Sequence, residues 1–482
     1  MRIKDLIEKE DIVYVDKRIN LNTKVTTTAA PKEPEPYILY ICKKAMGISR
    51  KITQRDIPMP PPYALVIDED RKCDADIPII RVKNARRSLA IACSKQNGID
   101  YTKFKVIGIT GTNGKTTTAT ILYKILRYSG YNVGFFGTGK ILYNDEVLSD
   151  SGYSMTTPDP VYLYSKIKEM QELGAQYVVA EISSHSIALN KIDAIPFHLC
   201  AFTNLSNEHM DFHFDLEDYY NTKLSLFSKC EYGVFNLDDK YSRRAYNEAN
   251  CKKYGVGILQ KAAGNVQEPE LLGLEGSRFN YCEQGLSFAI DLKLIGAMNI
   301  YNALIAIRCA LHLKIAPCDI RKAISEIEYI DGRMRLYQGK TRVIIDYAHT
   351  PNAYDNTLKT LKSILKPRQN LIVVFGCGGE RDKEKRPLIA KAVSKYADKI
   401  IITEDNSRGE EVKKIIADIV SGIPEEQAYT VIPKRRDAIL CALSDACVND
   451  IVAIVGKGEE GYICDSNGNR RYSDEAVVLS VL

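Results

Sequence analysis

Residues 105–118 read KVIGITGTNGKTTT, an apolar run followed by a glycine-rich turn and a polar triplet. The apolar run is typical of a buried strand, and the residues after the turn have a helical spacing that ends near Gly130. A helix beginning at Lys115 would direct free backbone N–H groups and the positive end of its dipole at the turn, an arrangement that binds phosphate. The P-loop pattern requires glycine at position 109, where this sequence has Ile109, so the loop is a variant.

The side chains of this loop suit a nucleotide site. Gly111 and Gly114 would let the backbone approach phosphate. Lys115 could reach the β- and γ-phosphates, and the Thr116 hydroxyl could hold Mg²⁺. The plainer interpretation is a glycine-rich turn followed by a threonine that caps the helix. Gly-Lys-Thr between a strand and a helix favours the phosphate site.

Composition narrows the class of protein. The 482 residues suggest two to four domains, and 45% hydrophobic with 26% charged residues indicates a soluble globular chain. The net charge of +5 is spread along the sequence, which argues against a nucleic-acid partner. We expect no membrane span, because no apolar run approaches ~18 residues. The N-terminus lacks a signal-peptide core, and the 13 cysteines include no C-x-x-C, so the cytoplasm is the expected location.

Three regions differ in their patterns. The first hundred residues hold two proline-rich segments, PKEPEPY (31–37) and PMPPPY (58–63), between short apolar runs, and predict a small irregular α/β domain. From Lys105 apolar strand patterns alternate with helical ones, including a long helix over 297–313. After DGRMR (331–335) strand patterns are separated by helical stretches of roughly ten to fifteen residues, which predicts a parallel sheet with helices on both faces.

Candidate metal ligands follow two of the predicted strands. Glu181 ends the strand pattern YVVAEIS, and the pattern after it ends in a segment crowded with acids and histidines, NEHMDFHFD (207–215). Oxygen ligands near phosphates are what Mg²⁺ requires. His209 and His213 are four residues apart, a spacing that also occurs in zinc hydrolases, but the H-E-x-x-H pattern is absent and such a pair is more often structural.

Taken together, these motifs resemble those of the Mur ligases, the ATP-dependent amino-acid ligases of peptidoglycan precursor synthesis. The resemblance covers residues 105–482 and rests on TGTNGKTTT, TTPDP, EISSH, FTNLSNEHMDFH, YYNTKLSLF, GAMNIYNALIA, DGRMR, DYAHTP, FGCGGERDKEKRP, EDNSR and GKGEEGY. It implies a small N-terminal α/β domain for the UDP-substrate (1–100), a central P-loop-type ATP-binding α/β domain (101–332) and a C-terminal Rossmann-like α/β domain for the amino acid (333–482). We expect a monomer.

The resemblance assigns a role to each candidate residue. ATP would phosphorylate the terminal carboxylate of UDP-N-acetylmuramoyl-L-alanyl-D-glutamate, and an incoming amine would displace the phosphate, with two Mg²⁺ ions present. The implied nucleotide contacts are Gly111, Thr112, Asn113, Gly114, Lys115, Thr116, Thr117, Asn299, Arg333 and Asp346. The implied metal ligands are Thr116, Glu181, His209 and Lys223 as a carbamate, and catalysis is assigned to Lys115, Glu181, His209 and Lys223. The muramoyl part would contact Thr156, Thr157, Ser183 and Lys191.

The incoming amino acid is expected to be meso-diaminopimelate, held by Arg381, Asp405, Asn406, Arg408, Gly456 and Glu460. Its distal carboxylate needs a cation, and arginine binds carboxylates bidentately. Bound lysine would leave Arg408 without a partner, which disfavours lysine. The plainer interpretation is that Arg408 is a solvated loop charge, just as Lys223 taken alone would be an ordinary surface lysine.

The sequence also departs from the family pattern and leaves alternatives open. Ser407 replaces the usual proline, and Glu459 stands where the family has histidine. In the first hundred residues LNTKV (21–25) is the nearest match to the family's D-S-R segment, and nothing matches its D-G-H segment. A paralogue that joins L-lysine or another amino acid to this or another acidic peptide therefore stays open. A P-loop NTPase switch without ligase activity is the alternative from a different class.

Overall fold

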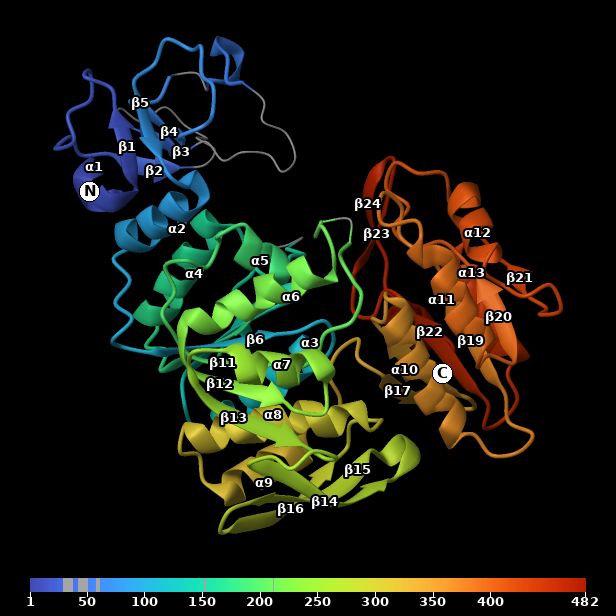
Figure 1. Cartoon of the computed structure of the whole chain (residues 1–482). Coiled ribbons are helices and arrows are strands. Elements are labelled where there is room, and N and C mark those ends of the chain that lie inside the picture. The colour runs from blue at the N-terminus through green and yellow to red at the C-terminus, as the bar shows by residue number, and fades with distance from the viewer. Residues whose placement is uncertain (29–37, 42–50, 58–60, 151–152, 211) are drawn as a thin grey trace.

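A computed structural model describes residues 1–28, 38–41, 51–57, 61–150, 153–210 and 212–482. Its main strands form a five-stranded, an eleven-stranded and a six-stranded sheet that follow one another along the chain. Figure 1 shows them as three bodies, with the last one facing the central one across the middle of the molecule. The α/β fold in three domains is therefore as the sequence predicts.

The N-terminal domain is a small sheet ordered β1-β5-β4-β3-β2. All neighbouring pairs are parallel except β1 with β5. The predicted apolar runs form β3 and β4, whereas PKEPEPY and the start of PMPPPY fall outside the described residues. The elements are α1 (Ile3–Leu6), β1 (Ile12–Val15), β2 (Thr26–Thr28), β3 (Ile38–Ile41), β4 (Ala64–Asp68), β5 (Ile79–Val82) and α2 (Ala85–Gln96).

The central domain is built on the sheet β16-β15-β14-β13-β12-β11-β6-β10-β7-β8-β9. Strands β7, β10, β6, β11, β12, β13 and β14 run parallel, and antiparallel strands extend both edges. The strands are β6 (Lys105–Thr110), β7 (Val133–Gly137), β8 (Lys140–Tyr143), β9 (Glu146–Val147), β10 (Tyr177–Glu181), β11 (Phe197–Phe202), β12 (Cys230–Asn236), β13 (Lys252–Gly257), β14 (Gly264–Leu271), β15 (Ser277–Glu283) and β16 (Leu286–Leu292).

Helices cover both faces of this sheet. Successive side chains of each parallel strand point to opposite faces, so each face needs a helical layer to form a core. One core joins the sheet to α4 (Pro160–Glu172), α5 (Ser184–Ala188), α6 (Leu216–Ser225) and α7 (Lys240–Glu248). The other joins it to α3 (Lys115–Tyr128), α8 (Met298–His312) and α9 (Pro317–Glu326). Val106 of β6 faces the first core and Ile107 the second, so the strand is buried on both sides.

The C-terminal domain has the doubly wound architecture that the sequence alternation predicts. Its sheet is ordered β17-β18-β22-β19-β20-β21, with only β17 antiparallel. Helices α10 (Pro351–Ile364), α11 (Lys385–Ser394) and α12 (Val412–Val420) pack on one face, and α13 (Arg435–Asp445) and α14 (Asp474–Leu479) on the other. The strands are β17 (Arg335–Gln338), β18 (Arg342–Asp346), β19 (Leu371–Phe375), β20 (Lys399–Ile402), β21 (Thr430–Val431) and β22 (Ile451–Val455), with the hairpin β23 (Tyr462–Asp465) and β24 (Gly468–Arg471).

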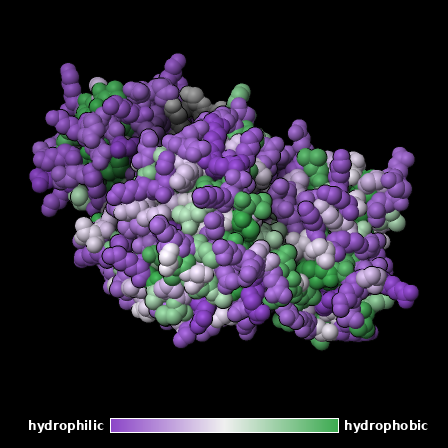
Figure 2. Space-filling model, turned by 60° about the horizontal axis from the view of Figure 1, so that its bottom comes forward, coloured by the Kyte–Doolittle hydropathy of each residue, from purple (hydrophilic) through white to green (hydrophobic). Residues whose placement is uncertain are grey.

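The surface is mainly hydrophilic on the face that Figure 2 shows, where apolar side chains form scattered groups. Isolated exposed apolar residues such as Phe214 and Leu259 are normal on folded proteins. Among the residues that the structure describes, no helix has both the length and the apolar character needed to cross a membrane.

Candidate active site

The glycine-rich loop joins the end of β6 to the start of α3, at the carboxyl edge of the parallel sheet. Gly114, the residue before α3, has φ +83°, and a side chain there would clash with Asn302 of α8. A side chain at Gly111 would clash with Thr203, which follows β11. These close approaches explain both glycines, because only glycine leaves room for the neighbouring side chains at these positions.

Polar side chains from the segment after β11 and from the start of α3 hold the loop in place. The Asn113 N–H donates to Asn204 Oδ1 (3.0 Å), and Thr203 Oγ1 donates to the Asn113 carbonyl (2.6 Å). The Lys115 ammonium donates to the loop carbonyls of Gly111 (3.0 Å) and Thr112 (2.7 Å). Burial lowers the pKa of Lys115, although Glu208 and Glu181 oppose that shift.

Asn299 and Asn302 lie one turn apart on α8 and connect this helix to α3, which packs in the same core. Asn302 Nδ2 donates to Asn299 Oδ1 (2.9 Å), and Thr118 Oγ1 donates to Asn302 Oδ1 (3.3 Å). Asn299 is predicted from the sequence to contact the nucleotide. Asn302 was not predicted, although the spacing of three residues on one helix face indicates that both side chains reach the same place.

Thr116 and Glu181 meet directly below the loop. Thr116 Oγ1 donates to Glu181 Oε2 (2.9 Å), and the Thr138 N–H donates to Glu181 Oε1 (3.0 Å). Glu181 is fully buried at the end of β10, one strand from the loop. Arg333, which lies just before β17, donates from Nη2 to Thr116 Oγ1 (3.0 Å), so a cation from the start of the C-terminal domain reaches the same hydroxyl.

A second group of ionisable side chains lies on the other side of the loop. The Lys223 ammonium is buried and donates to the Gly111 carbonyl (2.9 Å). Burial and the nearby Lys115 hold the pKa of Lys223 well below its ordinary value. His209 lies close to both lysines, and burial lowers its pKa to about 3. The four residues assigned to catalysis therefore converge around one loop.

Glu208 links this group to the C-terminal domain. It lies in the acid- and histidine-rich segment that the sequence offers for metal ligands, but no role was assigned to it there. Its Oε1 contacts His349 Nε2 (3.0 Å) and His209 Nε2 (3.6 Å). Burial raises the pKa of Glu208, but the hydrogen bond to His349 and the surrounding cations outweigh burial and lower that pKa below the ordinary range. The carboxylate therefore stays ionised between two histidines.

The donor set fits magnesium that shares its ligands with a phosphate. Within the described parts of the chain, His, Cys, Asp and Glu side chains nowhere gather in threes as a ready-made metal cage. Thr116 and Glu181 instead supply two oxygens side by side, and Mg²⁺ is commonly held by one or two carboxylates together with substrate phosphates. His209 and His213 contact different carboxylates, Glu208 and Asp218.

The residues proposed for the muramoyl part lie along the end of β10. Thr157 Oγ1 donates to the Glu181 carbonyl (3.0 Å) and lies 3.4 Å from Ser183 Oγ. The Thr156 hydroxyl contacts Thr138 Oγ1 (3.0 Å), and Lys191 pairs with Asp159 (2.9 Å). Thr156, Thr157 and Ser183 thus form one polar group beside the proposed metal site, with Lys191 in an ion pair of its own.

The residues proposed for the amino acid lie on the loops after β19, β20 and β22. Asn406 Nδ2 donates to Glu460 Oε2 (2.8 Å), and a Cβ on Gly456 would meet Asp405 Oδ2 at 3.1 Å. Arg408 donates through Nη1 to the carbonyls of Gly379 (2.7 Å) and Asn406 (3.3 Å). Its Nε and Nη2 have no hydrogen-bond partner within the described chain.

Two of the predicted site residues, Asp346 and Arg381, have fewer contacts with the rest of the site. Asp346 accepts hydrogen bonds from the Met334 and Ala348 N–H groups and from Thr357, all in its own domain. Burial raises the pKa of Asp346. Arg381 is exposed on the loop after β19 and has no hydrogen bond or ion pair in the described structure.

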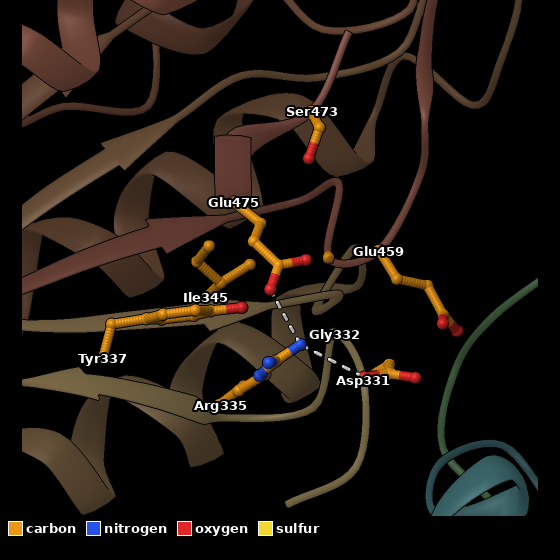
Figure 3. Close-up of a pocket in the computed structure, with 9 residues that line it drawn as sticks. Asp331, Gly332, Arg335, Tyr337, Ile345, Glu459, Ser473 and Glu475 are labelled. Carbon is orange, nitrogen blue, oxygen red and sulfur yellow. Dashed lines mark hydrogen bonds and ion pairs between the residues drawn. The ribbon is translucent and has the colours of Figure 1, made fainter. Parts of the chain in front are cut away.

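A cavity of about 250 Å³ lies at the junction of the central and C-terminal domains. Figure 3 shows Arg335 between Asp331 (3.2 Å) and Glu475 (3.0 Å), with Glu459 across the opening. Lys140 of β8 bridges Asp331 (3.1 Å) and Glu459 (3.0 Å). Glu459, the departure from the family pattern, therefore forms an ion pair between the two domains.

The phosphate loop of one α/β domain facing polar loops of a second α/β domain defines a nucleotide-dependent enzyme with its site between domains. Residues 109–310 match the Mur ligase middle domain, and residues 332–458 match the Mur ligase glutamate ligase domain. A relative from Aquifex aeolicus (strain VF5), named UDP-N-acetylmuramoyl-L-alanyl-D-glutamate–2,6-diaminopimelate ligase, is 36% identical over 475 residues, 98% of this chain and 96% of the relative. The chain belongs to the Mur ligase family, which consists of ATP-dependent ligases that form peptide bonds.

Other comparisons agree. A protein of the same name from Clostridium tetani (strain Massachusetts / E88) is 35% identical over 419 residues, 86% of this chain and 85% of the relative. A solved structure of a ligase with that name has a TM-score of 0.60 at 27% identity and covers 87% of this chain and 86% of its own. Folylpolyglutamate synthase of Mycobacterium tuberculosis, at 17% identity and a TM-score of 0.64 over 77% of this chain and 92% of its own, shares the fold alone.

Proposed function

We propose that this enzyme adds meso-diaminopimelate to UDP-N-acetylmuramoyl-L-alanyl-D-glutamate at the expense of ATP. The observation that carries the proposal is the convergence of Lys115, Glu181 and Lys223 on one phosphate loop, opposite a domain that presents Arg408. The names of the relatives support the same pair of substrates. Because UDP-linked precursors and ATP occur in the cytoplasm, we place the enzyme there, with domain limits at 1–100, 101–332 and 333–482.

The reaction divides between the two faces of the site. The loop N–H groups and Lys115 bind the ATP phosphates, while Arg333 reaches the same place from the other domain. The terminal carboxylate attacks the γ-phosphorus and releases ADP, giving an acyl phosphate. The neutral amine of the amino acid then attacks the acyl carbon, loses a proton and expels phosphate. Two Mg²⁺ ions, held through Thr116 and Glu181 and through His209 and carbamylated Lys223, would neutralise the crowded oxygens.

Selection of the amino acid depends on charge pairing in the C-terminal domain. Asp405 and Glu460 suit an ammonium group, and the free edge of Arg408 suits the distal carboxylate that diaminopimelate has and lysine lacks. Arg408 is only partly exposed, and a partly buried cation without a counter-charge is costly, so lysine in this pocket would be disfavoured.

The test is phosphate release from ATP by the purified enzyme, with the UDP-linked dipeptide and a panel of amino acids. Release that requires both the dipeptide and meso-diaminopimelate supports the proposal. Release with L-lysine or with another acidic peptide would identify a paralogue. Hydrolysis that ignores every amino acid and rises with a protein partner would instead identify a nucleotide switch.

Arg408→Ala tests the acceptor assignment. We expect this change to raise the KM for diaminopimelate by roughly a hundredfold, because a charged hydrogen-bonded pair is lost, and to leave the KM for ATP nearly unchanged. Arg321→Ala is the matched control, because Arg321 is an exposed arginine of α9 that belongs to no part of the predicted site. Equal effects of Arg408→Ala on both KM values would remove Arg408 from the pocket.

A further inference from the structure

Lys457 is a fully buried lysine in the middle of the proposed amino-acid pocket, and no role has been assigned to it above. It lies in the turn after β22, between Gly456 and Gly458, which have φ values of +115° and +54°. The flanking glycines allow the tight turn that directs the lysine inward, because left-handed backbone is readily adopted only by glycine.

The ammonium group of Lys457 has as many acceptors as it has protons. It contacts Glu460 Oε2 (2.9 Å), Asn406 Oδ1 (3.1 Å) and Asp405 Oδ1 (3.4 Å). An ammonium carries three N–H donors, so this set satisfies it completely. All three partners are residues proposed to contact the amino acid.

The contacts fix the orientation of the Asn406 amide. Asn406 Oδ1 accepts from Lys457 and from the Cys464 N–H (2.9 Å), and Asn406 Nδ2 donates to Glu460 (2.8 Å). A flipped amide would place its NH₂ group against two donors, which a buried site disfavours. Lys457 therefore determines which polar atom each of these side chains can offer to a ligand.

Lys457 also sets the charge of the pocket. Asp405 and Glu460 would together carry two negative charges in a desolvated place, and Lys457 leaves one of them in excess. Burial raises the pKa of Asp405, but Lys457 and Arg435 outweigh burial and lower it, so the carboxylate stays ionised. Arg435 is itself paired with Asp474 (2.8 Å), whereas Lys457 is the cation that directly contacts both Asp405 and Glu460.

We infer that Lys457 is a positioning residue for the amino-acid substrate: it orients Asp405, Asn406 and Glu460, and it leaves this group of side chains one net negative charge that matches a single substrate ammonium. The inference rests on the proposed function, because it takes these residues as the amino-acid pocket. Lys457 acts through its neighbours, and nothing in its role requires contact with the reacting atoms.

The experiment compares Lys457→Met with the wild-type enzyme for all three substrates. We expect the KM for diaminopimelate to rise at least about tenfold, with less than about a twofold change in the KM for ATP or for the UDP-linked dipeptide. Glu460→Gln should raise the KM for diaminopimelate by a smaller factor in the Lys457→Met variant than in the wild-type enzyme, because the two side chains act as a unit. Additive effects, or equal rises in all three KM values, would overturn the inference.

Asp450→Asn is the matched control for a purely structural role. Asp450 is buried at the other end of β22, where it accepts from the N–H groups of Asn370 (2.8 Å) and Cys447 (3.0 Å). Asp450→Asn should lower the melting temperature without raising the KM for diaminopimelate more than the KM for ATP or for the UDP-linked dipeptide. A selective rise in the KM for diaminopimelate, like that expected for Lys457→Met, would contradict the inference. If Lys457→Met does not fold, Lys457→Gln, which keeps amide donors without the charge, replaces it. Failure of both to fold would assign Lys457 to folding alone.

The wild-type measurement separates this inference from the proposed function. A wild-type enzyme that releases phosphate with none of the amino acids refutes the proposed function itself. A wild-type enzyme that uses diaminopimelate, together with a Lys457→Met variant of unchanged KM, refutes only the role of Lys457.

Discussion

Lys223 shows how one side chain acquires an unusual state from its surroundings. Its ammonium is buried, donates to the Gly111 carbonyl and lies 4.6 Å from the centre of the Tyr219 ring. Burial and Lys115 lower its pKa, so a larger share of the amine is neutral near pH 7 than in an exposed lysine. A neutral amine can capture CO₂, and the resulting carbamate would add an anion beside the phosphate loop.

We predict that Lys223 is carbamylated and that the carbamate is needed for activity. Enzyme equilibrated with ¹³C-bicarbonate should show a carbamate carbonyl resonance that Lys223→Met lacks, and Lys223→Met should lower kcat by roughly a hundredfold or more. Lys223→Arg, which keeps a positive charge but cannot form the carbamate, is the control and should be equally inactive. A fully active Lys223→Arg would refute the prediction.

Backbone strain marks two of the predicted site residues. His209 and Arg408 have φ values of +60° and +52°, in the left-handed region that costs non-glycine residues energy. Such conformations persist where the surrounding structure enforces them, and they concentrate at functional sites. Both residues were proposed from sequence motifs alone, and their assignment stays a prediction.

The connection between β6 and α3 depends on the contact of its turn with α8. Gly114 and Gly130, one residue before and two residues after α3, both have φ +83°, but only Gly114 is packed against another side chain, Asn302. A substitution at Gly130 meets only the backbone penalty, because no atom lies within 4 Å of its Cβ position.

Gly114→Ala is therefore predicted to impair the site more than Gly130→Ala. Gly130→Ala is the control, and it should cost roughly 1–2 kcal/mol of unfolding free energy and leave the KM for ATP unchanged. Gly114→Ala should cost more and raise the KM for ATP by about tenfold or more, since it displaces the loop. Adding Asn302→Ala should recover part of the stability. Urea denaturation and steady-state kinetics measure both effects, and equal behaviour of the two single variants would argue against the contact with Asn302.

At the end of α8, His312 contacts His198 of β11. Their Nε2 atoms lie 3.3 Å apart, and His198 Nδ1 faces Glu231 (3.2 Å). Burial, His198, Arg308 and Lys105 lower the pKa of His312 to about 4, and burial and Lys105 lower the pKa of His198 despite Glu231. Two neutral rings can share this contact, but two charged rings would repel.

This pair predicts that the free energy of unfolding decreases in mild acid. The folded pKa of His312 lies below its unfolded value of about 6.5, so the unfolded chain binds protons first. The contribution is complete above pH 6.5 and is lost as the pH falls toward about 4. Urea unfolding of His312→Gln should show a shallower decrease over this range than the wild type. An unchanged slope would exclude the pair as its source.

At the scale of the whole molecule, ionic contacts join the central and C-terminal domains. Lys140 contacts Glu459 and Asp331, and His349 contacts Glu208. Arg333 adds a hydrogen bond to Thr116 (3.0 Å) from the start of the C-terminal domain. Because the proposed site needs groups from both domains, these contacts favour the arrangement in which catalysis can occur.

Charge reversal tests the contact between Lys140 and Glu459. Lys140→Glu and Glu459→Lys should each lower kcat/KM by roughly threefold to tenfold, the range expected for a partly exposed ion pair. The double variant should recover part of that loss but not all, because Asp331 still faces the reversed charge at position 140. Small-angle scattering should show larger dimensions for the single variants than for the double variant. A double variant no better than either single variant would rule out the pairing.

The sequence by itself determined the alternation of strands and helices and the position of the glycine-rich loop, and it supplied the candidate metal ligands. These signals are local, since hydrophobic period, Gly-Lys-Thr spacing and strand ends are all read over short windows. The antiparallel edges β14–β16 and β8–β9 were not predicted, because pairing between strands is a non-local choice.

Only the tertiary structure decided which distant residues act together. Glu208 with His349, Asn302 with Gly114, Lys140 with Glu459 and Lys457 with Asn406 are pairs whose members are each far apart in the chain. Their roles come from burial and from the partner that folding brings into contact. A charged or polar group gains a specific function when desolvation makes its contacts strong, and desolvation is a property of the packed molecule.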